Sequence, residues 1–169
     1  MRIRPAQPAD EPALARFLEK WNALSVARRG VLEQPLEHGS LVAEAEERLV
    51  AVLAYAIRGP DCEVMALYVD EPRRGIGTAL LDEVGVIAEG AGCSRLWLVT
   101  TNDNLDALRF YQRRGFRLAA LRPGAVDESR AHLKPAIPST GSHGIPLRDE
   151  LELERELGRP AARRAPGSG

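Results

Sequence analysis

A short segment rich in arginine and glycine is the first place where this sequence could bind an anion. Its residues are Arg73, Arg74, Gly75, Ile76, Gly77 and Thr78. A helix that begins here leaves unpaired backbone N–H groups at the positive end of its dipole, and glycine lets an anion approach the backbone closely. The segment favours a phosphate or pyrophosphate site. A glycine-eased helix start with two solvated arginines is the plain alternative.

Two common nucleotide-binding motifs do not fit this segment. A dinucleotide-binding turn needs a third glycine where Leu80 stands. A P-loop needs Gly-Lys followed by Ser or Thr, and the sequence contains no such run.

A second group of residues could contact a ligand from one side of a later helix. Helical spacing places Asn104, Ala107 and Tyr111 on the same face. The amide of Asn104 can bind an amide-bearing ligand, Ala107 keeps the face thin, and Tyr111 offers a hydroxyl. The alternative is that Asn104 only caps the helix and Tyr111 is a core aromatic residue.

The first half of the chain must supply a helix and a set of strands. We expect a short strand at Ile3 and a helix from Asp10 whose apolar stripe is Leu14, Phe17, Leu18 and Trp21. For residues 22–40 we expect a second short helix and loops. The next strands are expected at 41–45, 48–58 and 62–69, joined by tight turns into an antiparallel meander.

The second half alternates helices and strands. A helix should follow the glycine segment, with Ile76, Leu80, Val84 and Ile87 facing inward. We then expect a strand at 95–100, a helix from Asn104 to a left-handed stop at Gly115, and a strand at 116–121. Residues 122–146 should form a long functional or mobile loop with one helical turn near Glu128. The last strand is expected at 146–157, so the domain is 1–157 and the tail 158–169 is disordered.

Composition narrows the class of protein. Hydrophobic residues make up 44% and the formal net charge is -1, so nothing suggests nucleic acid or an anionic membrane as a partner. The N-terminus lacks the apolar run of a signal peptide, and the longest apolar stretch, 49–57, is too short to cross a bilayer. We therefore expect a cytoplasmic protein. Cys62 and Cys93 are expected to be small buried hydrophobic residues, and the three histidines lack the spacing of metal ligands, so no metal is expected.

These motifs and this element order resemble the GNAT superfamily of N-acetyltransferases. The similarity rests on the segment 73–81 and on Asn104, Ala107, Phe110, Tyr111, Gly115 and Phe116. It implies a single-domain acyl-CoA N-acyltransferase fold of the α/β (α+β) class. That fold has a mixed, mostly antiparallel sheet of about six to seven strands with helices on both faces. It also implies acetyl-CoA as cosubstrate.

The resemblance implies a role for each site residue. The strand ending at Leu67–Val69 should splay from the next strand, and the pantetheine arm should bond to its backbone. Cofactor contacts would come from Leu67, Val69, Arg73, Arg74, Gly75, Ile76, Gly77, Thr78, Asn104 and Ala107. Two registers of the family's basic-glycine pattern fit: one uses Arg74, Gly77 and Ala79, and the other places Pro72 at the basic position.

The implied reaction is direct attack of a neutral amine on the thioester. Tyr111 would protonate the leaving thiolate, and a backbone N–H near Leu67 would bind the developing oxyanion. Glu63 is the expected base, acting directly or through water, although an outward-facing strand residue is an equal alternative. His143 is a lesser candidate. Two other functions stay open, a non-catalytic acyl-CoA-binding or sensing module and a domain that binds another nucleotide.

The amine acceptor is a small molecule or a peptide that the sequence does not identify. A group of acidic residues mildly favours a cationic amine, with solvated surface carboxylates as the alternative; they are Glu33, Glu37, Glu44, Glu46 and Glu47. The 122–146 loop is expected either to border the acceptor pocket or to contact a second subunit of a homodimer.

Overall fold

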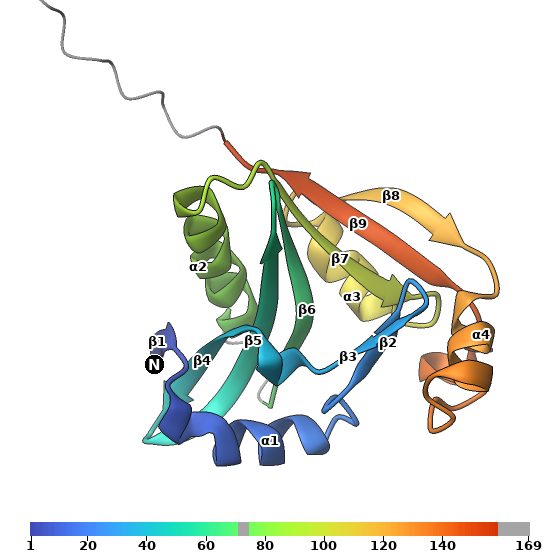
Figure 1. Cartoon of the computed structure of the whole chain (residues 1–169), viewed down its shortest axis with the longest axis horizontal. Helices are drawn as coiled ribbons and strands as arrows, with labels where there is room; N and C mark the ends of the chain where they lie inside the picture. The colour runs from blue at the N-terminus through green and yellow to red at the C-terminus, as the bar shows by residue number, and fades with distance from the viewer. Residues whose placement is uncertain (71–74, 159–169) are drawn as a thin grey trace, which may run out of the picture.

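A mixed sheet is the frame of the molecule. In the computed structural model, which describes residues 1–70 and 75–158, seven strands join in the order β1-β4-β5-β6-β7-β9-β8 (Figure 1). Neighbouring strands in this described part are antiparallel except β6 and β7. The strands are β1 (Arg2–Pro5), β4 (Gly39–Ala45), β5 (Arg48–Arg58), β6 (Asp61–Val69), β7 (Arg95–Thr101), β8 (Arg117–Arg122) and β9 (Glu150–Glu156).

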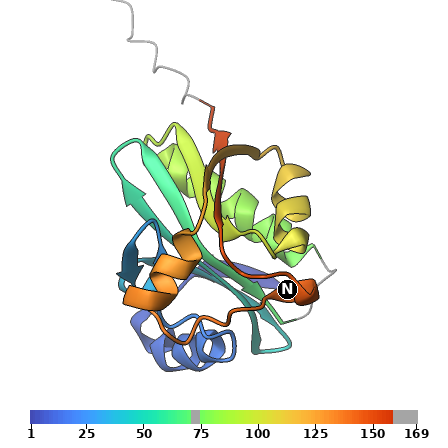
Figure 2. The same cartoon turned by 90° about the vertical axis from the view of Figure 1, so that its right-hand side faces the viewer.

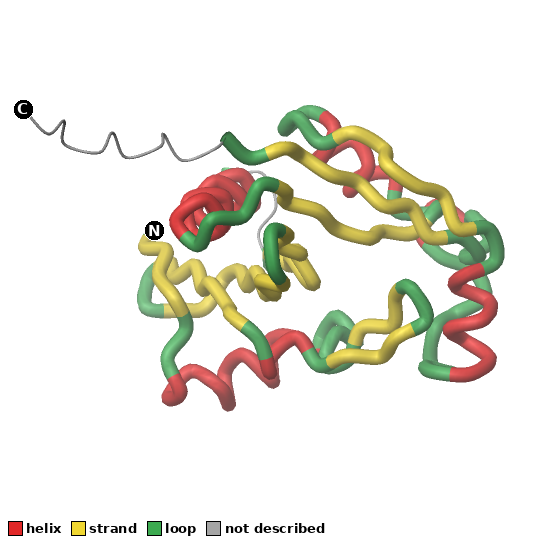
Figure 3. Tube along the Cα trace, turned by 45° about the horizontal axis from the view of Figure 1, so that its top comes forward, coloured by secondary structure: helices red, strands yellow, loops and turns green. Residues whose placement is uncertain are grey.

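Helices cover both faces of this sheet. Helix α1 (Glu11–Glu19) lies on one face, and α2 (Ile76–Gly90) and α3 (Leu105–Gln112) lie on the other (Figure 3). A fourth helix, α4 (Ala125–His132), stands at the end of the sheet beside β2 (Figure 2). The expected mixed, mostly antiparallel sheet with helices on both faces is confirmed.

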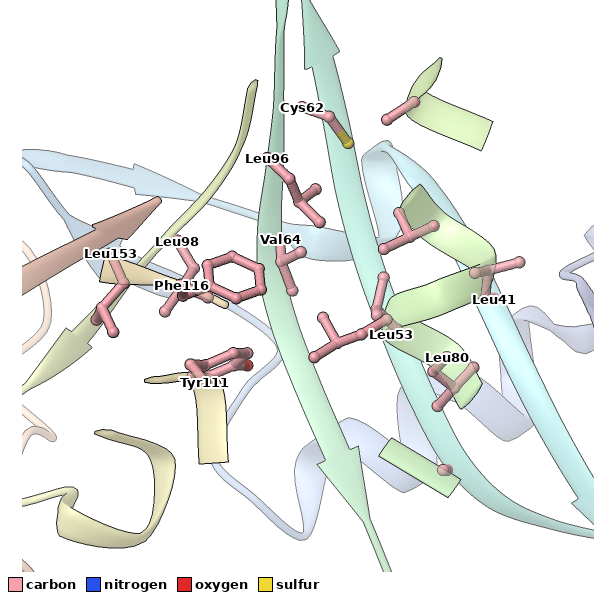
Figure 4. Packing of buried hydrophobic residues seen from close by; sticks show 14 of the residues in the cluster. Leu41, Leu53, Cys62, Val64, Leu80, Leu96, Leu98, Tyr111, Phe116 and Leu153 are labelled. Carbon is pink, nitrogen blue, oxygen red and sulfur yellow. The ribbon is translucent and has the colours of Figure 1, made fainter. Parts of the chain in front are cut away.

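The larger hydrophobic core lies between the sheet and α2. The expected inward stripe is confirmed, with Ile76, Leu80 and Val84 buried and Ile87 packed against the same cluster. Figure 4 shows Leu80 of this stripe among the neighbouring core residues. Fully burying an isoleucine, leucine or valine side chain stabilises the fold by about 1.5–3 kcal/mol, so this stripe fixes α2 to the strands. A second cluster joins α1 to the opposite face, through residues that include Leu14, Phe17 and Leu18.

Both cysteines are part of the core. Cys62 and Cys93 are free thiols with exposed fractions of 0% and 1%, as the sequence predicts. Burial raises the pKa of Cys62 to about 12, because the interior disfavours the thiolate. These side chains act as small apolar residues.

Residues 22–40 correct the sequence prediction of a helix. They form a hairpin of β2 (Val26–Arg28) and β3 (Val31–Glu33), followed by a 3-10 turn, η2 (Pro35–Glu37). The two turn residues, Arg29 and Gly30, have positive φ angles of 53° and 75°, which is the geometry of a tight hairpin turn. Each strand has only two consecutive apolar residues, and a pattern this short does not distinguish a strand from a helix.

The 122–149 region is also more ordered than expected. Eight residues form α4, where one helical turn was predicted, and Gly124 precedes it with φ 73°. Asp127 and Glu128 lie in its first turn and Arg130 in its last, the arrangement that a helix dipole favours. The final strand begins at Glu150, later than predicted. Residues 159–169 of the expected tail lie outside the described residues.

None of the helices in the described ranges has the length and apolar character that a membrane-spanning segment requires.

Candidate functional site

The gap between β6 and β7 is the centre of the site. These parallel strands pair only from Asp61 with Arg95 to Glu63 with Trp97 within the described chain, and then they diverge. On its other edge β7 stays paired with β9 over its whole length. The expected splay of the strand that ends at Leu67–Val69 is therefore present, and the last part of β6 turns an edge of backbone N–H and C=O groups toward the opening.

A β-bulge on β6 shapes this opening. Between Ala54 and Tyr55 of β5 the register skips Met65, so Val64 pairs with Tyr55 and Ala66 with Ala54. A bulge of this kind bends the strand and changes which face its side chains use. Tyr68 consequently packs on the α1 side of the sheet. There its ring stacks on Trp21, with the ring centroids 5.3 Å apart.

A cavity of about 370 Å³, here called the cleft, runs through the gap. One end is lined by Asn104, Ala107 and Tyr111 of the α3 side. The other end is lined by the β2 hairpin, α4 and the start of β9, including Ser129 and Glu150. The cleft therefore connects the α3 face of the sheet with the α1 face.

Tyr111 places a phenol in this cleft. Tyr111 is 7% exposed, and its ring packs edge-to-face on Phe110 and Phe116, with centroid distances of 5.1 and 5.4 Å. Figure 4 shows the rings of Tyr111 and Phe116. Burial, and secondarily the nearby Tyr68, raise the pKa of Tyr111 well above its ordinary value. A phenol of this kind stays protonated at neutral pH, so it is able to donate a proton.

Asn104 is both a cap and a cleft residue. Its side-chain Oδ1 accepts a hydrogen bond of 3.1 Å from the Ala107 N–H, so the expected helix cap is present. The amide NH₂ group is not used by that cap, and Asn104 also lines the cleft. The side chain of Asn104 is therefore able to cap α3 through its oxygen and to bind a ligand through its NH₂ group at the same time.

The glycine segment begins α2 as expected. Gly75 is the N-cap with φ 72° and supplies no side-chain cap, which leaves the first N–H groups of α2 for another partner. Gly77 has a packing role as well, since a methyl group there would lie 3.1 Å from Phe110 Cζ. Arg73 and Arg74 lie outside the described residues.

Thr78, in the first turn of α2, is held by an arginine that sequence reasoning did not single out. Its hydroxyl accepts a 2.8 Å hydrogen bond from Nε of Arg114 and a second one from Nη2 of the same guanidinium. That guanidinium also stacks over Phe110, 3.7 Å from the ring centroid. Arg114 therefore brings a fixed positive charge to the start of α2.

Glu63 lies in a different place from Tyr111. It is 2% exposed, so the alternative of an outward-facing residue is wrong. Its Oε1 accepts from Arg28 Nε at 2.5 Å, and its Oε2 accepts from Arg28 Nη2 at 2.7 Å and Arg58 Nη1 at 2.8 Å. It lines a second cavity, here called the ionic pocket, beneath the β2 hairpin at the paired end of β6 and β7. The structure does not bring the two predicted catalytic residues into one cavity.

The acidic group that favoured a cationic acceptor does not surround the cleft. None of its five members is among the residues that line it. Glu33 instead bonds to Arg58 at 2.6 Å, and Glu44 bonds to Arg4 at 2.6 Å. These two carboxylates therefore have structural partners, and the preference for a cationic acceptor drawn from the group stays a prediction.

Sequence reasoning missed the polar residues at the far end of the cleft. Glu150 is 2% exposed, and its carboxylate accepts from the backbone N–H of Arg29 at 3.0 and 3.2 Å. Lys134 donates to the carbonyls of Asn22 and Ser25, each at 2.6 Å, and burial lowers its pKa. A signal was available, because Glu150, Glu152 and Glu154 alternate with leucines in β9 and thus form an acidic row on one face of the strand.

The chain between α4 and β9 forms one wall of the cleft and is held in place by hydrogen bonds to the turn after β7. Asn102 Oδ1 accepts from the N–H groups of Arg148 and Asp149 at 3.0 Å, and its amide donates to the Pro146 carbonyl at 2.8 Å. Asp103 accepts from the Ser142 N–H at 2.8 Å. This explains the late start of β9, since the side chain of Asn102 binds the segment where a strand was predicted.

The described residues contain no cluster of three or more His, Cys, Asp or Glu side chains placed to hold a metal ion.

Comparison with known proteins adds a family and several relatives. A sequence model of the Acetyltransferase (GNAT) family matches residues 5–116. The chain is 38% identical over 142 residues to the uncharacterized protein YdhI of Bacillus subtilis (strain 168). The aligned region covers 83% of this chain and 88% of YdhI.

Solved structures share the fold along almost the whole chain. An IAA acetyltransferase from Bacillus cereus (ATCC 14579) is 25% identical, with a TM-score of 0.66 and coverage of 92% of this chain and 99% of that one. A GNAT family acetyltransferase from Elizabethkingia anophelis with acetyl-CoA bound is 20% identical, with a TM-score of 0.65 and coverage of 92% and 97%.

Proposed function

Since the chain belongs to the acetyltransferase (GNAT) family, whose enzymes are acyl-CoA-dependent N-acetyltransferases, we propose a direct transfer reaction for it. In this reaction an acetyl group moves from acetyl-CoA to a primary amine while both substrates are bound. The observation that carries the proposal is the cleft between β6 and β7, with Asn104, Ala107 and Tyr111 along its wall. A similar fold holds acetyl-CoA in the Elizabethkingia anophelis protein.

The residues present fit a pantetheine arm and a pyrophosphate. The diverging edge of β6 at Leu67 and Val69 offers backbone donors and acceptors to an extended chain, as a neighbouring strand would. The N-terminus of α2 has a glycine cap and no side-chain cap, which suits an anion. We propose that Gly75, Ile76, Gly77 and Thr78 hold the pyrophosphate together with Arg73 and Arg74.

The chain itself would contribute position and one proton donor. Acetyl-CoA supplies an acetyl group that is activated as a thioester. The backbone N–H near Leu67 would donate to the thioester oxygen, and the phenol of Tyr111 would donate its proton to the leaving sulfur. The amide of Asn104 would fix the arm, and the small side chain of Ala107 leaves space for it. Holding the amine and the thioester in the right orientation would add to the rate enhancement.

The base role of Glu63 stays a prediction, and its surroundings count against it. Both oxygens accept hydrogen bonds from guanidinium groups of Arg28 and Arg58. Taking a proton at Glu63 would break a buried ion pair, which is costly.

Thiol release from acetyl-CoA tests the proposed function. We expect the wild-type protein to release CoA thiol only when an amine acceptor is present, and to bind CoA in calorimetry. Binding without thiol release across polyamines, aminoglycosides, amino acids and peptide N-termini would favour the non-catalytic alternative. A thermal-shift comparison of CoA, ATP and NAD addresses other nucleotides, because saturation at a hundred times the Kd stabilises by about 2.7 kcal/mol.

A further inference from the structure

The far end of the cleft holds buried polar groups with unused hydrogen-bonding capacity. Ser129 is 2% exposed, and within the described chain its hydroxyl has no hydrogen-bond partner. Arg28 lines the cleft as well as the ionic pocket, and its Nη1 is likewise buried without a partner among the described residues. Buried polar groups are normally paired, so unpaired donors beside a cavity are available to a ligand that enters it.

Glu150 is the acidic member of this set. Neighbouring acids on the same face of β9 have guanidinium partners: Glu152 accepts from Arg95 at 2.5 Å and Glu154 from Arg95 at 2.7 Å. Glu150 accepts instead from a neutral backbone N–H of Arg29. A carboxylate has room for about four hydrogen bonds, and a buried negative charge without a cation is costly. The site is therefore suited to a cationic ligand group.

Each of the other charged groups discussed around Glu150 has at least one partner already. Lys134 donates to two backbone carbonyls, and Arg28 is paired with Glu63. Arg122, opposite Glu150 in the sheet register, donates to Glu152 through Nη2 at 2.6 Å, while its Nη1 is buried without a partner among the described residues. The phenols of Tyr68 and Tyr111 are uncharged at neutral pH, since burial raises the pKa of both. These contacts leave the Glu150 carboxylate as the ammonium-binding group of the cleft.

We infer that Glu150 binds the ammonium group of the acceptor and takes its proton, while the Ser129 hydroxyl and Arg28 Nη1 donate to an oxygen of the same molecule. This inference rests on the proposed function and deepens it. The acceptor is a small primary amine with an oxygen next to the amine, as in an amino acid, amino amide or amino alcohol. The cleft of about 370 Å³ must also admit the acetyl group, so the acceptor is small.

The protons balance in this scheme. Glu150 takes one of the three ammonium protons and passes it to water. As the C–N bond forms and the C–S bond breaks, Tyr111 gives its proton to sulfur and is reprotonated, through water, by the second ammonium proton. The third stays on the amide nitrogen. The products are the N-acetyl amine, CoA thiol and one released proton.

Glu150→Gln separates this role from a structural one. The glutamine Oε1 still accepts from the Arg29 N–H, so the hairpin stays attached, but the residue no longer takes up a proton. We expect kcat/KM to fall about 100-fold at pH 7 and to recover as the pH approaches the pKa of the amine. Glu154→Gln, on the same face of β9 but outside the cleft, is the matched control and should keep wild-type turnover.

The outcomes distinguish the inference from the proposed function. If the wild-type protein transfers acetyl groups and Glu150→Gln does so equally well at pH 7, Glu150 only fastens the hairpin and the inference is wrong. A loss that high pH does not relieve also overturns it. If the wild-type protein binds CoA but transfers to no amine, the proposed function fails first.

The acceptor oxygen has its own test. The wild type is compared with glycine, glycinamide, ethanolamine and ethylamine as acceptors, at equal concentration and at a pH below each amine's pKa. We expect ethylamine to react at least 10-fold more slowly than the best of the other three, which identifies the oxygen. Ser129→Ala should remove part of that preference while leaving ethylamine unaffected. Equal rates for all four acceptors would overturn this part.

Discussion

Two acidic residues at opposite ends of the β6–β7 gap have very different surroundings. Glu63, at the closed end, is fully engaged by Arg28 and Arg58 in the ionic pocket. Glu150, at the open end, is equally buried but is met by one backbone N–H of Arg29. Burial alone therefore does not mark a catalytic acid. The comparison teaches that unused hydrogen-bonding capacity inside a cavity is the more useful sign.

The largest expected effect is on stability at the closed end. Glu63→Gln removes the charge that compensates Arg28 inside the protein, and breaking a buried ion pair in this way costs about 3 kcal/mol or more. Urea unfolding should show this loss in the free energy of unfolding, whereas Glu150→Gln should stay within about 1 kcal/mol of wild type. A Glu63→Gln protein of wild-type stability that has lost turnover would reverse the comparison and restore Glu63 as the base.

The next effect is on turnover and comes from Tyr111, at the α3 end of the cleft. Tyr111→Phe keeps the ring contacts with Phe110 and Phe116 but removes the proton donor. We expect kcat to fall about 100-fold, equal to about 2.7 kcal/mol, with saturating acetyl-CoA and acceptor. The melting temperature should stay close to that of the wild type. Full turnover in this variant would show that the assigned acid is wrong.

A smaller effect should come from the wall of the cleft. At Gly141 a methyl group would collide with the carboxylate of Asp103, which binds the Ser142 N–H. Overpacking of this kind typically costs 1–3 kcal/mol, so we expect Gly141→Ala to lose about 1–2 kcal/mol in urea unfolding. The acceptor KM should rise while the Kd of CoA stays constant.

Gly90→Ala is the matched control for Gly141→Ala, because a methyl group there meets open space at the end of α2. An unchanged acceptor KM in Gly141→Ala would show that the chain between α4 and β9 does not shape the acceptor site.

The smallest effect concerns an ion pair far from the gap. Asp10 accepts from Arg4 at 2.6 and 2.9 Å, and the hydrogen bonds from Arg4 and Gln7 lower its pKa from 3.8 to about 2. A lowered folded-state pKa gives stability that is present above pH 4 and is lost as the pH falls toward 2. In urea unfolding measured from pH 5 to 2, Asp10→Asn should make the free energy of unfolding fall less steeply as the pH decreases. The same pH dependence in the variant and the wild type would show that other carboxylates account for the loss of stability in acid.

Most of the frame was predictable because its signals are local. The 48–58 strand and the α2 stripe follow from periodic apolar residues, and the start of α2 follows from its glycines. The hairpin at 26–33 was missed because its strands are only three residues long. The bulge at Met65 was missed because it depends on the pairing between β5 and β6. Apolar residues on both sides of Met65 give no local sign of it.

The site was only half predictable for a related reason. Asn104, Ala107 and Tyr111 come from one helix, so their spacing sets their common face. The partners of Glu63 and Glu150 come from distant parts of the chain, with Arg28 35 residues before Glu63 and Arg29 121 residues before Glu150. The periodicity of helices and strands does not predict contacts between residues that far apart in the sequence. Ser129 and Glu150 at the far end of the cleft also lie outside residues 5–116, where the family match ends.

Three consecutive residues after β7 join the two walls of the cleft. Asn104 caps α3 on one side, while the side chains of Asn102 and Asp103 hold the chain before β9 on the other. One turn of three residues therefore fixes both the start of α3 and the position of the chain that faces it across the cleft.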